Sequence, residues 1–530
     1  MKKTEITETS SAEMVTISRV EYEEQQRRIA KLEQQVSVLT EALRLSRHKR
    51  FGASSEKSED TLMEQLSFLF NEAEVFAETR TEAENVVVVP EHKRHKKHEY
   101  TLDDNNLPEN IPTEVVEHTL EGEALECPRC GDTMTDIGVE VVRKLKIKSI
   151  ELVVEEHRYH TYACRTCNQE DIDTPIVKAP REKSIIPGSF ATPEAIAHIM
   201  TQKFVMGSPL YRQEQEINRM GVKLSRQTMS NWILKATEDY LTPVYNHLHK
   251  ELLSREVLHA DETTLQVLHA PGKKPQSESY MWLYRTSGDT KQPIVLYEYC
   301  PGRKAAYPKT FLEGFQGYLH TDGYAGYHNL PVEITVVGCW THARRKFDEA
   351  VKSQPKGKGK GGSASQGLAY CNLLFEIEQG LVEKTAEERY IQRLEQAKPV
   401  LDAMLSWANS RTAAPQSALG KAFHYLKEQW PYLTNYLKDG RLEISNDRAE
   451  RSIKPFVIDR KNFLFANTPK GAAGSAVMFS MIQTAIENKL DPYRYLTWLL
   501  KEANNADLTD PETIEKLLPL NAPKECRAGK

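Results

Sequence analysis

The stretch EVLHADETTLQVL, Glu256–Leu268, predicts the central strand of a β-sheet. It is rich in aliphatic and β-branched residues, and the turn-forming pair Pro271-Gly272 follows it. Asp261 stands in its middle, where a buried strand normally carries an apolar residue. Because a buried charge is costly unless it is paired or holds a cation, Asp261 is a candidate metal ligand. The alternative is a strand-end carboxylate that backbone amides cap.

Four further strands are predicted around this one. Tyr280–Gly288 and Ile294–Cys300 follow in meander order, and a basic helical interval comes next. Gly317–Leu330 places Asp322 at the C-terminal end of a fourth strand, and a helical region separates it from the fifth strand, Glu333–Cys339. This order is close to that of the ribonuclease-H-like fold, in which the aspartates of the first and fourth strands lie side by side.

A third carboxylate comes from a late helix. Glu450 lies at the rim of the apolar face of this helix, after low-complexity and helical sequence that predicts an α-helical insertion. Two Asp and one Glu suffice to hold two Mg²⁺ ions (or Mn²⁺), about 3.5–4 Å apart, for phosphoryl transfer. Glu349 and Asp447 are the competing third ligands, whereas Glu262 is expected on the opposite strand face from Asp261.

Two CxxC pairs predict a zinc ribbon. Cys127 and Cys130 form one pair and Cys164 and Cys167 the other, with strand-like alternation between them. Four thiolates fill a tetrahedral Zn²⁺ site and leave no open position, so this zinc is expected to be structural. A redox CxxC is the alternative, and it is disfavoured by the presence of two pairs.

The N-terminal region predicts a coiled coil. From about Ile17 to Ser46, apolar residues recur in steps of three and four, which is typical of an oligomerising zipper; an intramolecular helix is the alternative. The helix ends in a basic run in which Arg47, Lys49 and Arg50 are candidate contacts to DNA phosphates. A solvated helix terminus is the alternative for this run.

Residues 190–254 are expected to be helical and to contain a helix-turn-helix. One helix ends at Arg219-Met220, Gly221 makes the turn, Val222 and Leu224 pack, and Ser225 caps a second helix. On that second helix, the exposed residues suited to DNA are Arg226, Gln227, Ser230 and Asn231. Generic helical hairpins share this pattern.

The bulk composition limits the remaining possibilities. The net charge is -5, so DNA binding must depend on local basic patches. The N-terminus lacks the apolar core of a signal peptide, and no run of apolar residues is long enough to span a membrane. The eight cysteines suit a metal in a reducing compartment better than a disulfide framework, so we expect a cytoplasmic, nucleoid-associated protein.

An ordered set of motifs resembles the transposases of the insertion sequence 66 family over nearly the whole chain. The motifs are the zipper with Arg50-Phe51-Gly52 and Ser55-Glu56-Lys57, CPRCG with CRTC, PLYRQE (Pro209–Glu214), HADET (His259–Thr263), TDGYAGY (Thr321–Tyr327), CWTHARRKF (Cys339–Phe347), NDRAER (Asn446–Arg451) and DRKNFLF (Asp459–Phe465). The resemblance implies a DDE transposase whose catalytic positions match Asp261, Asp322 and Glu450. One departure is Asn446-Asp447, where the family tends to have Asn-Asn.

The resemblance also implies that the basic end Arg44–Arg50 and the helix-turn-helix read the terminal inverted repeats, and further candidate DNA contacts lie near the catalytic core. The candidate phosphate contacts there are His342, Arg344, Arg345, Arg460 and Lys461, with surface salt bridges as their alternative. The expected partners are the terminal inverted repeats, target DNA and a second protomer joined through the zipper; accessory transposition proteins are a further class of partner in such families.

We therefore expect a multidomain α/β protein. Its predicted parts are a coiled coil with a basic end (1–50), a linker (51–115), a zinc ribbon (116–185), a helix-turn-helix domain (190–254), a ribonuclease-H-like core in two parts (255–350 and 441–505), an insertion with a low-complexity loop (351–440) and a C-terminal tail (506–530). The predicted function is a DNA transposase. The rivals are a non-catalytic DNA-binding protein with a relict nuclease core, and a hydrolytic nuclease without strand transfer.

Overall fold

The computed structural model describes residues 183–354 and 362–528, together with two short strands and a few single residues before them. The chain divides into two compact units, one of which holds Pro180–Arg527 and the other Gly52–Ala179. Apart from Gln26 and Glu33, which are helical, the predicted zipper lies outside the described residues. The same holds for its basic end with Arg47, Lys49 and Arg50, the linker 51–115 and the four ribbon cysteines. Within the second unit, β1 (Thr161–Ala163) pairs antiparallel with β2 (Ile176–Lys178).

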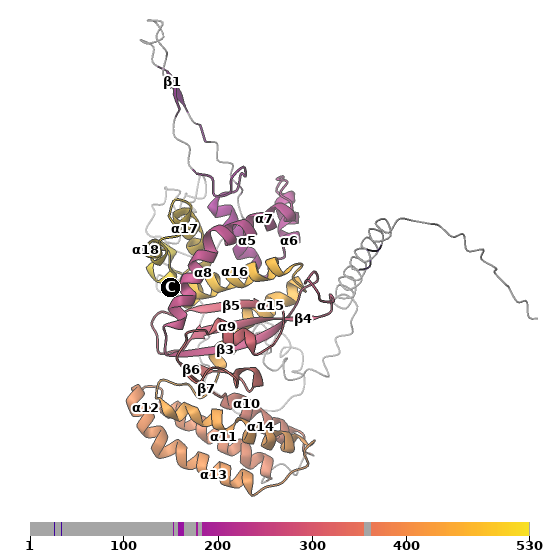
Figure 1. Ribbon diagram of the computed structural model, residues 1–530, viewed down its shortest axis with the longest axis vertical. Coiled ribbons are helices and arrows are strands. Elements are labelled where there is room, and N and C mark those ends of the chain that lie inside the picture. Colours follow the sequence, from indigo (N-terminus) through magenta and orange to yellow (C-terminus); the bar gives the residue numbers. More distant parts are fainter. Residues whose placement is uncertain are drawn as a thin grey trace, which may run out of the picture. The chain divides into compact units, whose positions relative to one another are not determined.

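A five-stranded sheet forms the centre of the larger unit (Figure 1). Its strands are β3 (Val257–Gln266), β4 (Glu278–Thr286), β5 (Val295–Cys300), β6 (Gly317–His320) and β7 (Ile334–Val337), in the order β5-β4-β3-β6-β7. The first three strands are antiparallel to one another, whereas β6 and β7 run parallel to β3. All five strands lie where the sequence predicts them, and the first predicted strand is the central one. The short helix α9 (Ala306–Phe311) lies between β5 and β6, where the sequence predicts a helical interval. The helical region predicted between β6 and β7 is a single 3₁₀ turn, Ala325–Tyr327.

Side chains from helices satisfy both edges of this sheet. Along β5, the Thr484 hydroxyl bonds both backbone groups of Val295, and the Tyr297 N–H donates to Ser480 Oγ at 2.7 Å. At the other edge, Asn435 Nδ2 donates to the carbonyl of Val336 at 2.8 Å. Unpaired strand edges invite aggregation, and these contacts occupy edge groups of both outer strands and dock α16 (Pro469–Glu487) along β5.

Helices from the two ends of the larger unit share one core with the sheet (Figure 1). The N-terminal set is α5 (Pro193–Phe204), α6 (Leu210–Arg219), α7 (Arg226–Ala236) and α8 (Thr242–Leu253), and the C-terminal set is α15 (Asp447–Phe463), α16, α17 (Pro492–Asn504) and α18 (Pro511–Lys516). A π-helical segment, Thr237–Leu241, joins α7 to α8. The predicted helix-turn-helix domain therefore shares a core with the sheet and the C-terminal helices rather than forming a separate unit.

The helix-turn-helix forms at the predicted boundaries. Gly221 has φ +90°, a left-handed conformation that favours glycine, and Ser225 Oγ accepts from the N–H of Thr228 at 3.1 Å to begin α7. Leu224 is buried, as predicted. Val222 is 39% exposed, so the prediction that it packs is wrong.

The predicted insertion is helical and has its own core. It contains α11 (Ser363–Gly380), α12 (Ala386–Gln392), α13 (Lys398–Asn409) and α14 (Ala418–Leu433), and it packs on α10 (Trp340–Lys352). The buried Arg393 binds both carboxylate oxygens of Glu378 and donates to three carbonyls in the segment that leads to α15. This arginine therefore ties the insertion to the chain that returns to the sheet.

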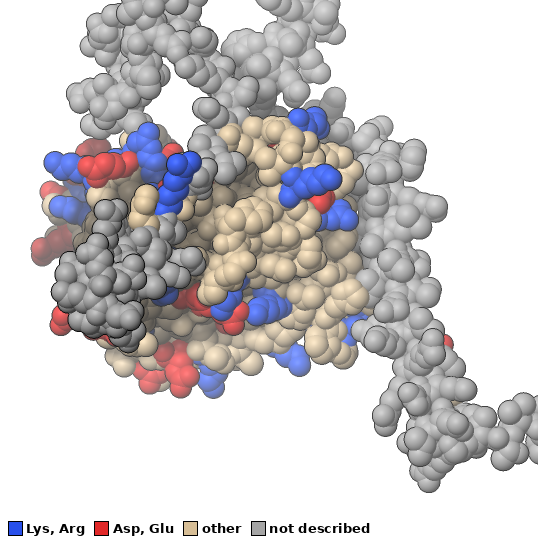
Figure 2. Space-filling model, turned by 90° about the horizontal axis from the view of Figure 1, so that it is seen from above, with Lys and Arg blue, Asp and Glu red and all other residues tan. Residues whose placement is uncertain are grey.

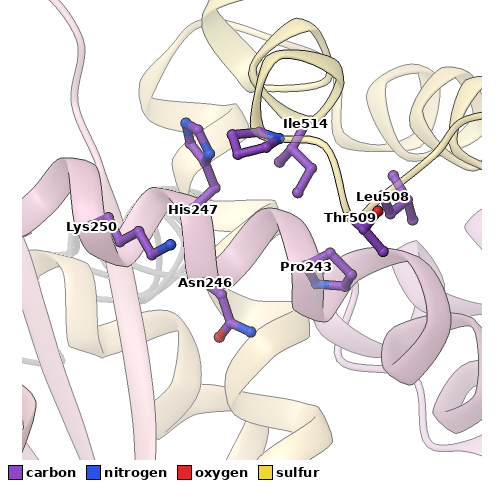
Figure 3. Close-up of a pocket in the computed structure, with 8 residues that line it drawn as sticks. Pro243, Asn246, His247, Lys250, Leu508, Thr509 and Ile514 are labelled. Carbon is purple, nitrogen blue, oxygen red and sulfur yellow. The ribbon is translucent and has the colours of Figure 1, made fainter.

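The C-terminal segment, which the sequence suggested as a tail, packs on α8. Ile514 of α18 and Leu517 are buried, and a small pocket lies between α8 and this segment, lined by Pro243, His247 and Ile514 among others (Figure 3). No helix in the described part of the chain is long and apolar enough to cross a membrane.

Candidate active site

The register of the parallel strands brings the two predicted aspartates together. His259 of β3 pairs with His320 of β6, and this is the last residue pair between the two strands. Asp261 and Asp322 each lie two residues beyond that pair, so they occupy equivalent places on the two adjacent segments. Since residues two apart on a strand share a face, Asp261 is expected on the same side of the sheet as His259.

Both aspartates are partly exposed and are oriented by backbone amides. Asp261 Oδ1 accepts from the N–H of Glu262 at 2.8 Å, and Asp322 Oδ1 accepts from the N–H of Tyr324 at 2.9 Å. Burial raises the pKa of the Asp261 carboxyl well above its usual value. The negative charges of Glu262, Asp322 and Glu450 raise that pKa further, and each must lie close by to do so.

Glu262 has a different environment from Asp261. Its side chain is 1% exposed, its Oε2 accepts from the Tyr327 hydroxyl at 2.7 Å, and Arg303 forms an ion pair with its Oε1. Burial and the charge of Asp322 raise the pKa of Glu262. Arg303 also stacks on Tyr324, 3.9 Å from the ring centre. Glu262 thus holds the segment after Asp322 against the sheet.

Asn446 fastens the start of α15 to the central strand. The side chain is completely buried; Nδ2 donates to the carbonyl of Ala260 at 2.8 Å, and Oδ1 lies 3.0 Å from His259 Nδ1. Its backbone N–H donates to Cys339 Sγ at 3.2 Å. Ala260 immediately precedes Asp261, and Glu450 lies one helical turn beyond Asn446. The Asn446 contacts therefore fix the distance between α15 and the aspartates.

Two buried histidines lie beneath this contact. The rings of His259 and His320 stack at 4.3 Å and 12°, and His259 Nε2 lies 3.2 Å from Ser287 Oγ. Because Asn446 Oδ1 is an acceptor, His259 carries its proton on Nδ1 and accepts from Ser287 at Nε2. Burial lowers the pKa of His259 to about 3, and nearby arginines favour the neutral ring further. Burial lowers the pKa of His320 as well.

These pKa values predict an acid-sensitive fold. Unfolded His259 binds a proton near pH 6.5, whereas folded His259 does so only near pH 3, so stability falls as pH decreases between these values. We expect the pH dependence of the unfolding free energy to be shallower in His259→Gln by up to about 1.4 kcal/mol per pH unit. Urea unfolding at several pH values measures it. The exposed His424→Gln is the control, and equal slopes for wild type and His259→Gln would contradict the prediction.

Glu450 lies in the first turn of α15, against the first turns of α10. His342 Nδ1 is 3.6 Å from Glu450 Oε1, and Arg345 Nη2 is 4.0 Å from Glu450 Oε2. Cys339, which immediately precedes α10, is fully buried next to them. Burial and the charge of Glu450 raise the pKa of the Cys339 thiol to about 12. The third predicted carboxylate therefore lies between the aspartates and the basic face of α10.

The competing third ligands have other surroundings. Glu349 lies further along α10, where it is half-exposed and 3.7 Å from Lys346. Asp447 is the first residue of α15 and is partly exposed. Glu450, by contrast, is among the main causes of the raised pKa of Asp261, after burial and the charges of Glu262 and Asp322.

The predicted phosphate contacts are distributed over several environments. His342 and Arg345 face Glu450, whereas Arg344 donates to Asn372 of α11 at 2.7 Å. Arg460 of α15 donates to the hydroxyl groups of Thr263 and Thr264 on β3, and Lys461 is exposed on the same helix. Arg460 therefore also anchors α15 to the central strand.

The predicted recognition helix is accessible. Arg226, Gln227 and Asn231 are exposed on α7, Ser230 is partly exposed, and Gln227 donates to Asn231 at 3.0 Å. Arg226 also lies over the ring of Tyr211, 5.6 Å from its centre. Figure 2 shows the molecule from the side on which α5, α6 and α7 lie in Figure 1. Lys and Arg side chains form separate groups there around a broad uncharged area.

Comparison with known proteins gives the family. A sequence profile described as "Transposase IS66 family" matches residues 188–474, which include β3 to β7, the insertion and α15. The chain belongs to this transposase family. A second profile, "zinc-finger binding domain of transposase IS66", matches residues 125–168 and indicates zinc binding there. A third, "Transposase C of IS166 homeodomain", matches residues 38–116, which begin within the predicted zipper and include the predicted linker.

Curated relatives of this IS66 transposase exist in Sinorhizobium fredii (strain NBRC 101917 / NGR234). The chain is 30% identical to "Uncharacterized protein y4hP" over 410 residues, which cover 74% of this chain and 71% of the relative. It is also 30% identical to "Uncharacterized protein y4jD" over 434 residues, which cover 78% and 81% respectively. Both relatives are described as uncharacterized, so neither adds an activity.

Sequence reasoning overlooked three parts of this site in the IS66 transposase. These are the Asn446 anchor, the stacked His259–His320 pair and the position of Cys339 beside Glu450. One signal was available, because His259 precedes Asp261 by two residues and must share its strand face. The partners of these residues were not predictable, because they lie 61 to 187 positions away in the chain.

Proposed function

We propose that this IS66 transposase binds the terminal inverted repeats of an insertion sequence and catalyses metal-dependent cleavage and strand transfer at Asp261, Asp322 and Glu450. In the first step, water attacks a phosphodiester at the element end. In the second, the freed 3′-OH attacks target DNA at the same site. The observation that carries the proposal is that Asp261 and Asp322 each lie two residues beyond the last residue pair of the parallel strands β3 and β6, with Glu450 close enough to raise the pKa of Asp261.

The sheet supports a ribonuclease-H-like core. Its first strand lies between the second and the fourth, and its fourth and fifth strands are parallel to the first. This is the arrangement in which the first- and fourth-strand aspartates become neighbours. A helical insertion then separates the second aspartate from the glutamate, and the Arg393 contacts bring the chain back to the sheet.

The residues present fit a pair of hard divalent cations. All three side chains offer carboxylate oxygens, which Mg²⁺ and Mn²⁺ prefer, and their mutual repulsion is the feature that a cation would relieve. Two bound Mg²⁺ ions supply Lewis-acid activation of the attacking oxygen and stabilise the leaving oxygen. The backbone amides of Glu262 and Tyr324 hold the two aspartates in place, and Asn446 holds α15 at a fixed distance from them.

The other segments supply DNA binding and assembly. Cys127, Cys130, Cys164 and Cys167 are proposed as ligands of one structural Zn²⁺, in keeping with the zinc-finger match. The exposed residues of α7, with Arg47, Lys49 and Arg50, are proposed to contact the terminal repeats. The zipper is proposed to pair two protomers, because two DNA ends must be joined in one complex.

The decisive test concerns the third ligand. Labelled inverted-repeat ends and Mg²⁺ are incubated with wild type, Glu450→Gln and the matched control Glu349→Gln. We expect strand transfer to fall by about 10³-fold in Glu450→Gln, because an amide cannot replace the anionic ligand, and to be unchanged in Glu349→Gln. The measurement is the rate of joined product formation.

Each other outcome identifies a rival. Binding of the ends without any cleavage by the wild type would support a non-catalytic DNA-binding protein with a relict nuclease core. Cleavage without joining would support a hydrolytic nuclease. A loss of activity in Glu349→Gln rather than Glu450→Gln would give the third position to Glu349.

A further inference from the structure

Three donor atoms of unlike chemistry meet at the start of α10. One atom each from Cys339, His342 and Glu450 lies within 4.8 Å of the others, and we refer to these three residues as the Cys–His–Glu cluster. Cys339 immediately precedes α10, and His342 lies three residues later on an adjacent helix position. Glu450 comes from the first turn of α15, which Asn446 holds in place. The cluster is therefore assembled by two helix starts fixed to the same sheet.

The cluster contains polar atoms that lack partners. His342 Nδ1 and Glu450 Oε1 are buried atoms with no hydrogen-bond partner within the described part of the chain. They lie 3.6 Å apart, too far for a hydrogen bond to each other. Most buried polar atoms in folded proteins are satisfied, so a pair of facing unsatisfied atoms requires an explanation. A cation between them would bind both atoms at once.

The donor set selects the class of cation. A thiolate sulfur, an imidazole nitrogen and one carboxylate oxygen suit Zn²⁺ and related thiophilic ions, whereas Mg²⁺ prefers oxygen ligands alone. The N–H of Asn446 donates to Cys339 Sγ at 3.2 Å and orients the sulfur, and a cation that binds there would displace the thiol proton. Three protein ligands leave the fourth tetrahedral position open to water or to a phosphate oxygen.

We propose that Cys339, His342 and Glu450 form a binding site for a thiophilic divalent cation such as Zn²⁺, and that its occupancy withdraws Glu450 from Asp261 and Asp322. Glu450 cannot serve both sets of ligands fully, so zinc at this cluster opposes Mg²⁺-dependent chemistry. Zinc binding stands on the cluster geometry alone. The regulatory consequence rests on the proposed function, because it requires Glu450 to be a ligand of the catalytic cations.

The first experiment measures zinc stoichiometry in the full-length protein. Wild type, Cys339→Ser and His342→Gln are dialysed against zinc in excess Mg²⁺, and bound zinc is measured by elemental analysis. The controls are Cys371→Ser, a buried cysteine in α11, and the exposed His424→Gln. We expect wild type and both controls to hold one zinc equivalent more than Cys339→Ser and His342→Gln. Equal zinc content in wild type and His342→Gln overturns the site; because His342 is partly exposed, this variant keeps the test valid if Cys339→Ser fails to fold.

The second experiment measures inhibition. Strand transfer by each variant is titrated with zinc and normalised to its own zinc-free rate. We expect the half-inhibitory zinc concentration to be about tenfold higher or more in His342→Gln than in wild type or His424→Gln. Equal inhibition of His342→Gln and wild type overturns the regulatory role. A wild type that never performs strand transfer counts against the proposed function instead, and the zinc stoichiometry still decides the site.

Discussion

Asp261→Asn is expected to lower the rate of strand transfer by about 10³-fold, close to 4 kcal/mol of activation free energy, while leaving the protein at least as stable as wild type. Activity is expected to fall because an amide would supply no anionic oxygen ligand to the proposed divalent cations. Stability is retained because partial burial and the like charges of Glu262, Asp322 and Glu450 raise the pKa of the wild-type carboxyl. Such a pairing of lost activity with retained stability is typical of a strained functional site.

The stability difference between Asp261→Asn and wild type is expected to depend on pH in a definite direction. A carboxyl whose pKa is raised in the folded state contributes stability at low pH and loses it as pH increases through the folded value. The difference in unfolding free energy between Asp261→Asn and wild type should therefore favour the variant at neutral pH and shrink on acidification. Urea unfolding of both proteins at neutral pH and at acidic pH measures this difference.

A matched control separates the site from a general charge effect. Asp402 lies on the surface of α13 and pairs with Lys398 at 2.8 Å. Asp402→Asn should change stability by less than about 1 kcal/mol and leave strand transfer unchanged. If Asp261→Asn retained full activity, the metal-site proposal would fail. A strongly destabilised Asp261→Asn would contradict the like-charge argument.

The second large effect is expected at Asn446. In Asn446→Ala, the buried carbonyl of Ala260 and Nδ1 of His259 both lose their partner. Leaving two buried polar groups unsatisfied costs about 2–4 kcal/mol in total, so the unfolding free energy should fall by that amount. Because the same contacts set the position of Glu450, we also expect strand transfer to fall by roughly 10- to 100-fold at saturating DNA.

The test must show that Asn446 is a positioning residue rather than a merely structural one. A weakened α15 anchor should raise the Mg²⁺ concentration needed for half-maximal rate, while the affinity for the terminal repeats stays unchanged. A variant that loses only stability, with an unaltered Mg²⁺ dependence, would contradict the positioning role.

The neighbouring residue is the matched control, and it addresses the one departure from the family motifs. Asp447 begins α15 and is partly exposed, so its charge interacts favourably with the helix N-terminus. Asp447→Asn restores the Asn-Asn pair and should cost less than about 1 kcal/mol. We expect its strand-transfer rate to stay close to that of wild type. A larger effect at Asp447 than at Asn446 would reverse these assignments.

The errors of the sequence interpretation have identifiable physical causes. Val222 is apolar and next to a turn, but a turn residue is buried only if another element covers it, and none does so fully here. Residues 506–530 are predicted to be a tail, yet α18 packs on α8, a contact that local sequence does not encode. The helix expected between β6 and β7 is a 3₁₀ turn, Ala325–Tyr327, whose last residue donates its hydroxyl to Glu262 of β3.

The sequence by itself determined what depends on neighbouring residues. Alternation and β-branching predicted the five strands, Gly221 and Ser225 predicted the helix-turn-helix boundaries, and the chemistry of Asp261, Asp322 and Glu450 predicted a site for hard cations. The tertiary structure decided which of these residues meet. His259 and Asn446 are 187 positions apart and the Cys–His–Glu cluster joins two helices across the insertion, and such contacts arise from packing around a shared core rather than from local preference.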